Sequence, residues 1–153
     1  MKVLVVDDSG AMRKYVIAAL SSIPGFTHFD EAEDGKKALE AARTQNYDLI
    51  MMDWNMPALS GLDAVIAMRS LGINTPIIMA TTNAEKKQVV NALKAGANDY
   101  VIKPFTHELL AAKCRKTLSI NFPPPENKIP TPESNEEEQK ETETQEMEKK
   151  ESA

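Results

Sequence analysis

Short apolar runs alternate with amphipathic segments along the first 121 residues of the chain. Apolar runs of about four to eight residues bounded by turn signals are typical of strands, whereas apolar side chains three and four positions apart are typical of helices. The pattern predicts five strands, each followed by a helix. The strands are expected at 2–6, 27–32, 49–53, 77–80 and 99–102, and the helices at 9–20, from 34, from 61, at about 84–95 and at 106–118.

The third run is the most informative, because four large apolar residues are followed at once by a carboxylate. Leu49 to Met52 precede Asp53, and Pro57 ends the segment. A strand that is apolar throughout suits a parallel sheet covered on both faces. Five successive strand–helix units therefore predict an α/β fold: an open, doubly wound parallel sheet with helices on both faces.

Polar side chains stand where four of the five predicted strands end. Asp7 and Asp8 follow the first strand, and Asp53 ends the third. Thr81 follows the fourth strand and Lys103 the fifth. Taken singly, each residue is more typical of a cap or a turn. Because the carboxyl ends of parallel strands meet at one edge, where ligands bind, their common position predicts a site.

Three carboxylates at one edge would repel one another and raise each other's pKa unless a cation joined them. Hard oxygen ligands suit Mg²⁺, whereas zinc would favour histidine or cysteine. The chain has two histidines, His28 and His107, and both fall away from this edge. We therefore expect a Mg²⁺ site without a histidine ligand.

A carboxylate in such a site can act as a nucleophile towards phosphorus and form an aspartyl phosphate. Asp53 is the candidate nucleophile. Lys103 would hold the oxygens of the transferring group as a point charge, and the Thr81 hydroxyl would donate a further hydrogen bond. These residues predict phosphoryl transfer to the protein itself.

The charge of the chain is unevenly distributed. The net charge of −5 arises from residues 122–153, which carry ten acidic and four basic side chains, whereas residues 1–121 are near neutral. The last segment has almost no apolar residue after Ile129, so it cannot bury enough surface to offset the entropy of folding. We predict one folded domain over 1–121 and an acidic, Pro- and Glu-rich disordered tail over 122–153.

The sequence also bears on the location of the protein. No apolar run approaches the roughly 18 residues of a membrane span, and the N-terminus lacks the pattern of a signal peptide. Cys114 is the single cysteine, so no intramolecular disulfide can form. These features predict a cytoplasmic protein, which we expect to be a monomer with neither a membrane nor a nucleic-acid partner.

Several motifs together resemble the receiver domains of two-component response regulators, and most closely the stand-alone chemotaxis members of that family. The resemblance covers about residues 1–121. The motifs that carry it are Val5-Val6-Asp7-Asp8-Ser9, Glu31-Ala32-Glu33-Asp34-Gly35, Asp53-Trp54-Asn55-Met56-Pro57, Gly61-Leu62, Thr81-Thr82, Ala95-Gly96-Ala97 and Tyr100-Val101-Ile102-Lys103-Pro104-Phe105.

The resemblance implies a flavodoxin-like (βα)5 sandwich with strand order 2-1-3-4-5. It implies that Asp53 takes a phosphoryl group from a phosphohistidine kinase. Asp8, Asp53 and the backbone carbonyl of Asn55 would ligate Mg²⁺, with Asp7 acting largely through water. Thr81 and Lys103 would bind the phosphoryl oxygens, and the Lys103–Pro104 bond is commonly cis in relatives.

Tyr100 matches the aromatic switch residue of the family. The resemblance implies that Thr81 moves towards the phosphoryl group and that the Tyr100 ring then turns inward. This would change the face formed by the fourth helix, fifth strand and fifth helix, where an output protein such as the flagellar motor switch binds. Asn55 and Asn83 match positions that flank the path of the hydrolytic water and tune hydrolysis and the response to a phosphatase. Many chemotaxis members carry an acidic residue in place of Asn83.

Two other functions fit part of this pattern. A phosphorelay intermediate or an adaptor outside chemotaxis would have the same single-domain layout. An aspartate-nucleophile phosphatase would use Asp53 on a small substrate, but such enzymes usually carry a second aspartate two residues after the nucleophile. Asn55 occupies that position here, so the sequence favours a phospho-accepting signalling protein over an enzyme.

Overall fold

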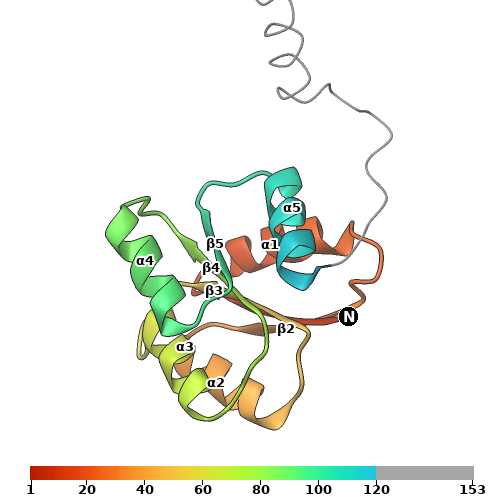
Figure 1. Cartoon of the computed structure of the whole chain (residues 1–153). Helices are drawn as coiled ribbons and strands as arrows, with labels where there is room; N and C mark the ends of the chain where they lie inside the picture. The colour runs from red at the N-terminus through yellow and green to blue at the C-terminus, as the bar shows by residue number, and fades with distance from the viewer. Residues whose placement is uncertain (120–153) are drawn as a thin grey trace, which may run out of the picture. The chain divides into compact units, whose positions relative to one another are not determined.

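Five strands alternate with five helices along residues 1–119, the part of the chain that the computed structural model describes (Figure 1). The predicted acidic tail, residues 122–153, lies outside the described residues. The strands are β1 (Lys2–Val6), β2 (His28–Ala32), β3 (Leu49–Asp53), β4 (Ile77–Thr81) and β5 (Asp99–Ile102), and the helices are α1 (Gly10–Ser21), α2 (Gly35–Thr44), α3 (Gly61–Ser70), α4 (Lys86–Ala95) and α5 (His107–Leu118).

The strands form one parallel sheet in the order β2-β1-β3-β4-β5. Helices α1 and α5 lie on one face of the sheet, and α2, α3 and α4 lie on the other (Figure 1). The predicted α/β, doubly wound parallel fold is thus confirmed, and so is the strand order that the family resemblance implied. None of the helices in residues 1–119 is long and apolar enough to cross a membrane.

The apolar strands occupy the middle of the sheet. Every residue of β3 and β4 is buried, because helices cover both faces of these two strands. The edge strand β2 has one buried residue, Ala32, and exposes His28 and Glu31. The most apolar run of the sequence therefore places Asp53 at the centre of the sheet, at the carboxyl edge.

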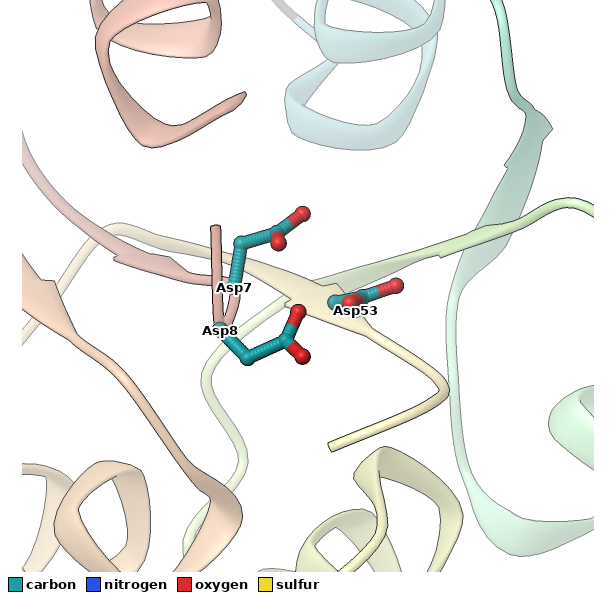
Figure 2. Close-up of side chains that lie close together, drawn as sticks. All are labelled: Asp7, Asp8 and Asp53. Carbon is teal, nitrogen blue, oxygen red and sulfur yellow. The ribbon is translucent and has the colours of Figure 1, made fainter. Parts of the chain in front are cut away.

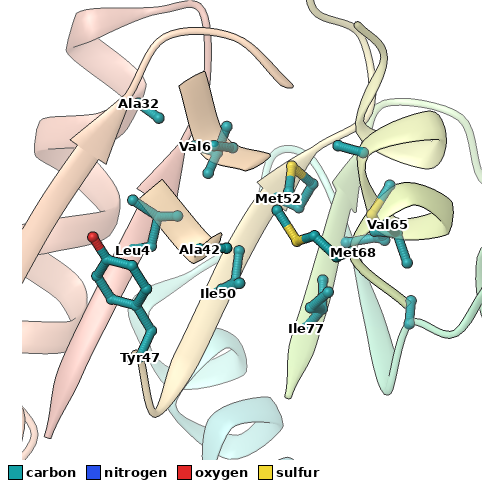
Figure 3. Packing of buried hydrophobic residues seen from close by; sticks show 14 of the residues in the cluster. Leu4, Val6, Ala32, Ala42, Tyr47, Ile50, Met52, Val65, Met68 and Ile77 are labelled. Carbon is teal, nitrogen blue, oxygen red and sulfur yellow. The ribbon is translucent and has the colours of Figure 1, made fainter. Parts of the chain in front are cut away.

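The core between the sheet and helices α2, α3 and α4 is built from aliphatic and methionine side chains (Figure 3). Leu4 and Val6 point into this layer, so Val3 and Val5, which alternate with them, point to the opposite face. A fully buried Leu, Ile or Met side chain contributes about 1.5–3 kcal/mol to folding. The largest fully buried members of the layer are Leu4, Ile50, Met52, Met68, Ile77 and Met79.

Four of the helices begin at a side-chain cap. The hydroxyl of Ser9 accepts a hydrogen bond from the backbone N–H of Met12 at 3.2 Å, and the other three caps are Asp34, Ser60 and Thr106. Such a cap satisfies one of the free N–H groups of the first turn. The capping residue predicted at Ser9 and the helix start predicted at Asp34-Gly35 are confirmed.

The start of α4 was predicted about two residues too early. The helix begins at Lys86 rather than near Ala84, because polar side chains hold the preceding residues in a turn. The backbone N–H of Asn83 donates to the Thr81 hydroxyl at 3.1 Å, and Asn83 Oδ1 accepts from the N–H of Glu85 at 2.8 Å. The predicted end is confirmed: Gly96 closes the helix in the left-handed region, with φ of +115°.

Candidate functional site

Three carboxylates meet at the carboxyl edge of the sheet (Figure 2). Asp7 and Asp8 lie just beyond β1, and Asp53 is the last residue of β3. One oxygen from each of the three lies within 4.8 Å of the others. Asp7 and Asp53 are only 4% and 6% exposed, whereas Asp8 is open to solvent. The structure therefore brings Asp53 next to Asp7, which stands 46 positions earlier in the sequence, and to its neighbour Asp8.

The sheet register explains this convergence. Val6 of β1 pairs with Met52 of β3, so the residues that follow each strand emerge side by side. The start of α3 then packs directly against the end of β3. A Cβ on Gly61 would lie 1.9 Å from the backbone oxygen of Asp53, so only glycine allows this approach.

Lys103 lies between two of these carboxylates. Its ε-ammonium group donates to Asp7 Oδ2 at 2.7 Å and to Asp53 Oδ1 at 3.0 Å, and its side chain is 13% exposed. Burial lowers the pKa of Lys103, but the hydrogen bonds and charges of the two aspartates outweigh burial and raise the pKa. Lys103 is thus charged and held at the site, although it stands 50 residues after Asp53 in the sequence.

The pKa of the Asp53 carboxyl lies above its ordinary value. Burial is the largest cause, the ion pair with Lys103 opposes it, and the charges of Asp7 and Asp8 add to it. Asp53 Oδ1 is engaged by Lys103, while its second oxygen accepts no hydrogen bond from residues 1–119. The site holds an excess of negative charge, because a single ammonium group faces three carboxylates.

The donor set fits a hard divalent cation. Among residues 1–119, this is the one group of three acidic, histidine or cysteine side chains close enough together to share a metal. All three ligand atoms are carboxylate oxygens, which Mg²⁺ and Ca²⁺ prefer, and no nitrogen or sulfur ligand accompanies them. His28 and His107 lie elsewhere: the first begins the edge strand β2, and the second begins α5, where its ring makes an edge contact with Tyr15.

The other predicted site residues, Thr81, Asn55 and Asn83, make no hydrogen bond to the carboxylates in the described part of the chain. Thr81, the last residue of β4, is 3% exposed, and its hydroxyl accepts from Asn83. Asn55 is exposed two residues beyond β3. Within residues 1–119 no hydrogen bond joins Thr81, Asn55 or Asn83 to the carboxylates. The Lys103–Pro104 peptide bond is cis.

Tyr100 lies outside the cluster, on β5, with its ring half-buried. The ammonium group of Lys113 lies 4.8 Å from the centre of the ring, a distance typical of a cation–π contact. Lys113 also pairs with the buried Asp99 at 3.0 Å. The switch residue implied by the family resemblance is therefore partnered by a cation from α5.

Sequence reasoning missed two charged residues beside the site. Arg13, on α1, donates from Nη1 to the backbone oxygen of Asp7 at 2.7 Å and from Nε to Glu31 Oε1 at 3.0 Å. Glu31 belongs to β2, the one strand to which the sequence assigned no site residue. A signal existed in the spacing: Arg13 follows the cap Ser9 by one helical turn, so its side chain can reach back to the end of β1.

The fold and the site together define the class of protein. Strand order 2-1-3-4-5, with clustered aspartates and a lysine at the carboxyl edge, is the arrangement that the resemblance to receiver domains implied. Residues 3–115 match the family model of the response regulator receiver domain. The chain belongs to this family.

Chemotaxis proteins are among its similar relatives. The chemotaxis protein CheY of Pseudomonas aeruginosa is 40% identical over 118 residues, which cover 76% of this chain and 94% of that protein. CheY1 of Helicobacter pylori is 43% identical over 124 residues, which cover 79% and 99% of the two chains. The recognition of a CheY-like receiver domain from sequence motifs is thus confirmed.

A solved structure adds information on the metal. The receiver domain of the sensor histidine kinase PA1611 from Pseudomonas aeruginosa is similar with a TM-score of 0.69 and 33% identity, covering 78% of this chain and 98% of that one. That structure has a magnesium ion coordinated in its active-site cleft. The carboxylates of Asp7, Asp8 and Asp53 in the present chain are close enough together to hold a metal ion.

Proposed function

We propose that this chain is a single-domain response regulator in which Asp53 accepts a phosphoryl group from a histidine kinase. The observation that carries the proposal is the environment of Asp53. One oxygen is held by Lys103, the other accepts no hydrogen bond from residues 1–119, and two further aspartates lie beside it. A carboxylate so placed can attack phosphorus while its neighbours hold a cation.

In the proposed reaction, an Asp53 carboxylate oxygen forms a bond to phosphorus as the phosphorus–nitrogen bond of the donor phosphohistidine breaks. The bonding electrons leave with the imidazole, and Asp53 becomes an aspartyl phosphate. Lys103 offers a fixed positive charge to the phosphoryl oxygens. The Thr81 hydroxyl accepts from Asn83, which leaves its own proton free to be donated to a phosphoryl oxygen.

Asp7, Asp8 and Asp53, with the backbone carbonyl of Asn55, would hold Mg²⁺. A bound Mg²⁺ would neutralise charge on the phosphoryl oxygens in the transition state. Without a cation, the excess negative charge of the cluster would repel the anionic donor. The proposed reaction is therefore Mg²⁺-dependent.

The output of the proposed signal is a change of binding surface. Thr81 would move towards the phosphoryl group, and the ring of Tyr100 would turn inward and change the face of α4, β5 and α5. The new charge would shift a pre-existing equilibrium between two arrangements. Asn55 and Asn83 would tune the lifetime of the aspartyl phosphate and its response to a phosphatase.

Similarity to chemotaxis proteins supports an output partner such as the flagellar motor switch. A phosphorelay intermediate is a second candidate, because one similar structure is the receiver domain of a sensor histidine kinase. A cytoplasmic location and a monomeric state remain predictions. Phosphorylation of Asp53 is common to both candidates.

Intact mass spectrometry tests the proposed function. We expect the full chain to gain one phosphoryl group from phosphoramidate or acetyl phosphate in the presence of Mg²⁺. The gain should be absent when the metal is chelated and absent in Asp53→Asn. If neither small donors nor a histidine kinase phosphorylated the chain, the domain would only bind and the proposal would be wrong.

A further inference from the structure

The Arg13 side chain links three elements at the edge of the acidic cluster. It extends from α1, donates to the backbone oxygen of Asp7 after β1, and pairs with Glu31 of β2. Its side chain is 19% exposed, so most of it is packed against the protein. The backbone of Arg13 is itself fixed, because its N–H donates to the oxygen of Ser9 in the first turn of α1.

This link determines how the peptide between Asp7 and Asp8 is oriented. The oxygen of Asp7 and the N–H of Asp8 belong to one planar group, so a hydrogen bond that fixes the oxygen also fixes the point at which Asp8 leaves the loop. Asp8 is exposed, and its side chain makes no hydrogen bond to residues 1–119. Arg13 is thus the side chain that holds the peptide before Asp8 by its oxygen.

Asp7 is held at other points as well. Its N–H donates to the oxygen of Ala32 at 3.1 Å and extends the β1–β2 ladder. Its carboxylate accepts from the N–H of Ser9 at 2.9 Å and from Lys103. The bond from Ser9 closes an Asx turn around the Asp7–Asp8 peptide, and the bond from Arg13 is the one that holds the oxygen of that peptide directly.

We propose that Arg13 is a positioning residue for the Asp7–Asp8 segment, with Glu31 as its anchor, and that this pair sets how tightly the cluster binds a divalent cation. The inference rests on the proposed function, because it concerns the metal site of that function. Arginine suits the task because Nε and Nη1 point in different directions from one rigid plane. A lysine offers a single ammonium group and cannot hold both acceptors in this geometry.

Charge alone would predict a different behaviour. Arg13 is a cation near the cluster, so its removal would strengthen cation binding if only its charge mattered. Glu31 lies 3.0 Å from Arg13 Nε, and its negative charge opposes that of Arg13. The loss of positioning should therefore outweigh the loss of charge. Weaker Mg²⁺ binding after removal of Arg13 would indicate positioning, and tighter binding would indicate charge.

The test is Mg²⁺ titration of the full chain, followed by the fluorescence of Trp54, its single tryptophan, and by calorimetry. We expect Arg13→Met to weaken Mg²⁺ binding by about three- to tenfold, less than the tenfold or more typical of lost contacts behind metal ligands. Arg13→Lys should recover less than half of the loss. The neutral pair Arg13→Met with Glu31→Gln should bind as weakly as Arg13→Met.

Arg43→Met is the matched control, because Arg43 pairs with Glu40 on the exposed side of α2, and its Mg²⁺ affinity should equal that of the wild type. Urea unfolding in chelator shows whether each variant is folded. If Arg13→Met does not fold, the Mg²⁺ affinities of the milder variants Arg13→Lys and Glu31→Gln provide the test. Tighter binding by Arg13→Met, or wild-type affinity of the double variant or of Arg13→Lys, would overturn the positioning role. Failure of the wild type itself to bind Mg²⁺ would instead overturn the proposed function.

Discussion

At the scale of single residues, the site is an imbalance of charge that the fold maintains. Within the cluster, the ammonium group of Lys103 is the one positive charge that opposes the negative charges of Asp7, Asp8 and Asp53. Two of the carboxylates are almost fully buried, so water screens their repulsion poorly. The chain thus keeps an incomplete cation site, which favours a divalent metal and disfavours an anionic donor until that metal is bound.

Replacing Lys103 should therefore lower the free energy of unfolding, because the carboxylates would then repel one another without a cation between them. In Lys103→Met, Asp7 and Asp53 lose their shared cation, and removing one partner of a buried ion pair typically costs about 3–5 kcal/mol. We expect a loss of about 3 kcal/mol in urea unfolding with chelator, and partial recovery on adding Mg²⁺, which restores positive charge. Lys37→Met, which breaks an exposed pair with Glu33, should leave stability unchanged. Equal stability of Lys103→Met and the wild type would contradict this account.

The raised pKa of Asp53 predicts a pH dependence of stability in the metal-free protein. The folded-state pKa lies above the ordinary value of 3.8, so at intermediate pH the folded chain holds a proton that the unfolded chain has lost. The stability of the wild type relative to Asp53→Asn should therefore be lowest at neutral pH. It should rise as pH falls through the folded-state pKa towards 3.8.

Thermal unfolding in chelator between pH 7 and pH 4 measures this difference. At pH 7, Asp53→Asn should melt a few degrees above the wild type, because it removes one of the crowded charges. The two melting temperatures should approach each other as the pH falls. A wild type that melts above Asp53→Asn at pH 7, with a gap that narrows at lower pH, would show that Lys103 outweighs burial.

The residues of the cluster could be placed at one edge from sequence, but their contacts could not. Strand ends in a parallel sheet share an edge whatever the side chains are, which is why Asp7, Asp8 and Asp53 were expected together. The bond of Lys103 to both Asp7 and Asp53 depends on the path of the chain after β5. The pairing of Arg13 with Glu31 joins side chains 18 residues apart on α1 and β2, which no local pattern encodes.

At the scale of elements, the junction of β3 and α3 holds Asp53 in place. Gly61 begins α3 against the end of β3, and its N–H donates to the oxygen of Trp54 at 2.9 Å. Position 61 has no space for a side chain, because a Cβ would overlap the backbone oxygen of Asp53. The backbone of Asp53 is thus fixed from both the sheet and the helix.

Gly61→Ala should disturb this junction. The overlap is with backbone, which cannot rotate away, so α3 must move from the end of β3. We expect a loss of at least about 2 kcal/mol in urea unfolding, within the range of overpacking, and weaker Mg²⁺ binding. Gly10→Ala is the matched control, because a Cβ at that helix start meets only ordinary contacts, with Arg13 at 3.5 Å. The account would be wrong at this point if both variants behaved like the wild type.

The strands could be placed from sequence more accurately than the start of α4. The bounds predicted for β1, β3 and β5 agree with the structure, because a charged residue marks the end of each apolar run. The start of α4 was misplaced, because the turn before it is held by the side chains of Asn83 and Thr81. Such a turn competes with the helix for the same N–H groups.

At the scale of the whole molecule, one edge of the sheet gathers the chemistry and another surface would carry the signal. The carboxyl ends of β1, β3 and β5 supply the cluster and Lys103. Tyr100 lies on β5 next to Lys113 of α5, away from the cluster. In the proposed function, the sheet is a rigid frame that connects the phosphorylated residue with the surface that a partner reads.

The acidic segment 122–153 should not be needed for this chemistry. Residues 1–119 contain every strand, helix and site residue described above, and the family match spans residues 3–115. A chain ending at residue 121 should melt within about 2 °C of the full chain and be phosphorylated within twofold of its rate by a small donor. A large drop in rate would show that the acidic segment takes part in donor docking.

The central claim is that Asp53, and not Asp7 or Asp8, carries the phosphoryl group. The direct measurement is borohydride reduction of the phosphorylated full chain, followed by peptide mass spectrometry, because borohydride converts an aspartyl phosphate into homoserine. The account predicts homoserine at position 53 and unchanged aspartate at positions 7 and 8, with no conversion when Mg²⁺ is chelated. Homoserine at position 7 or 8, or conversion independent of the metal, would contradict it.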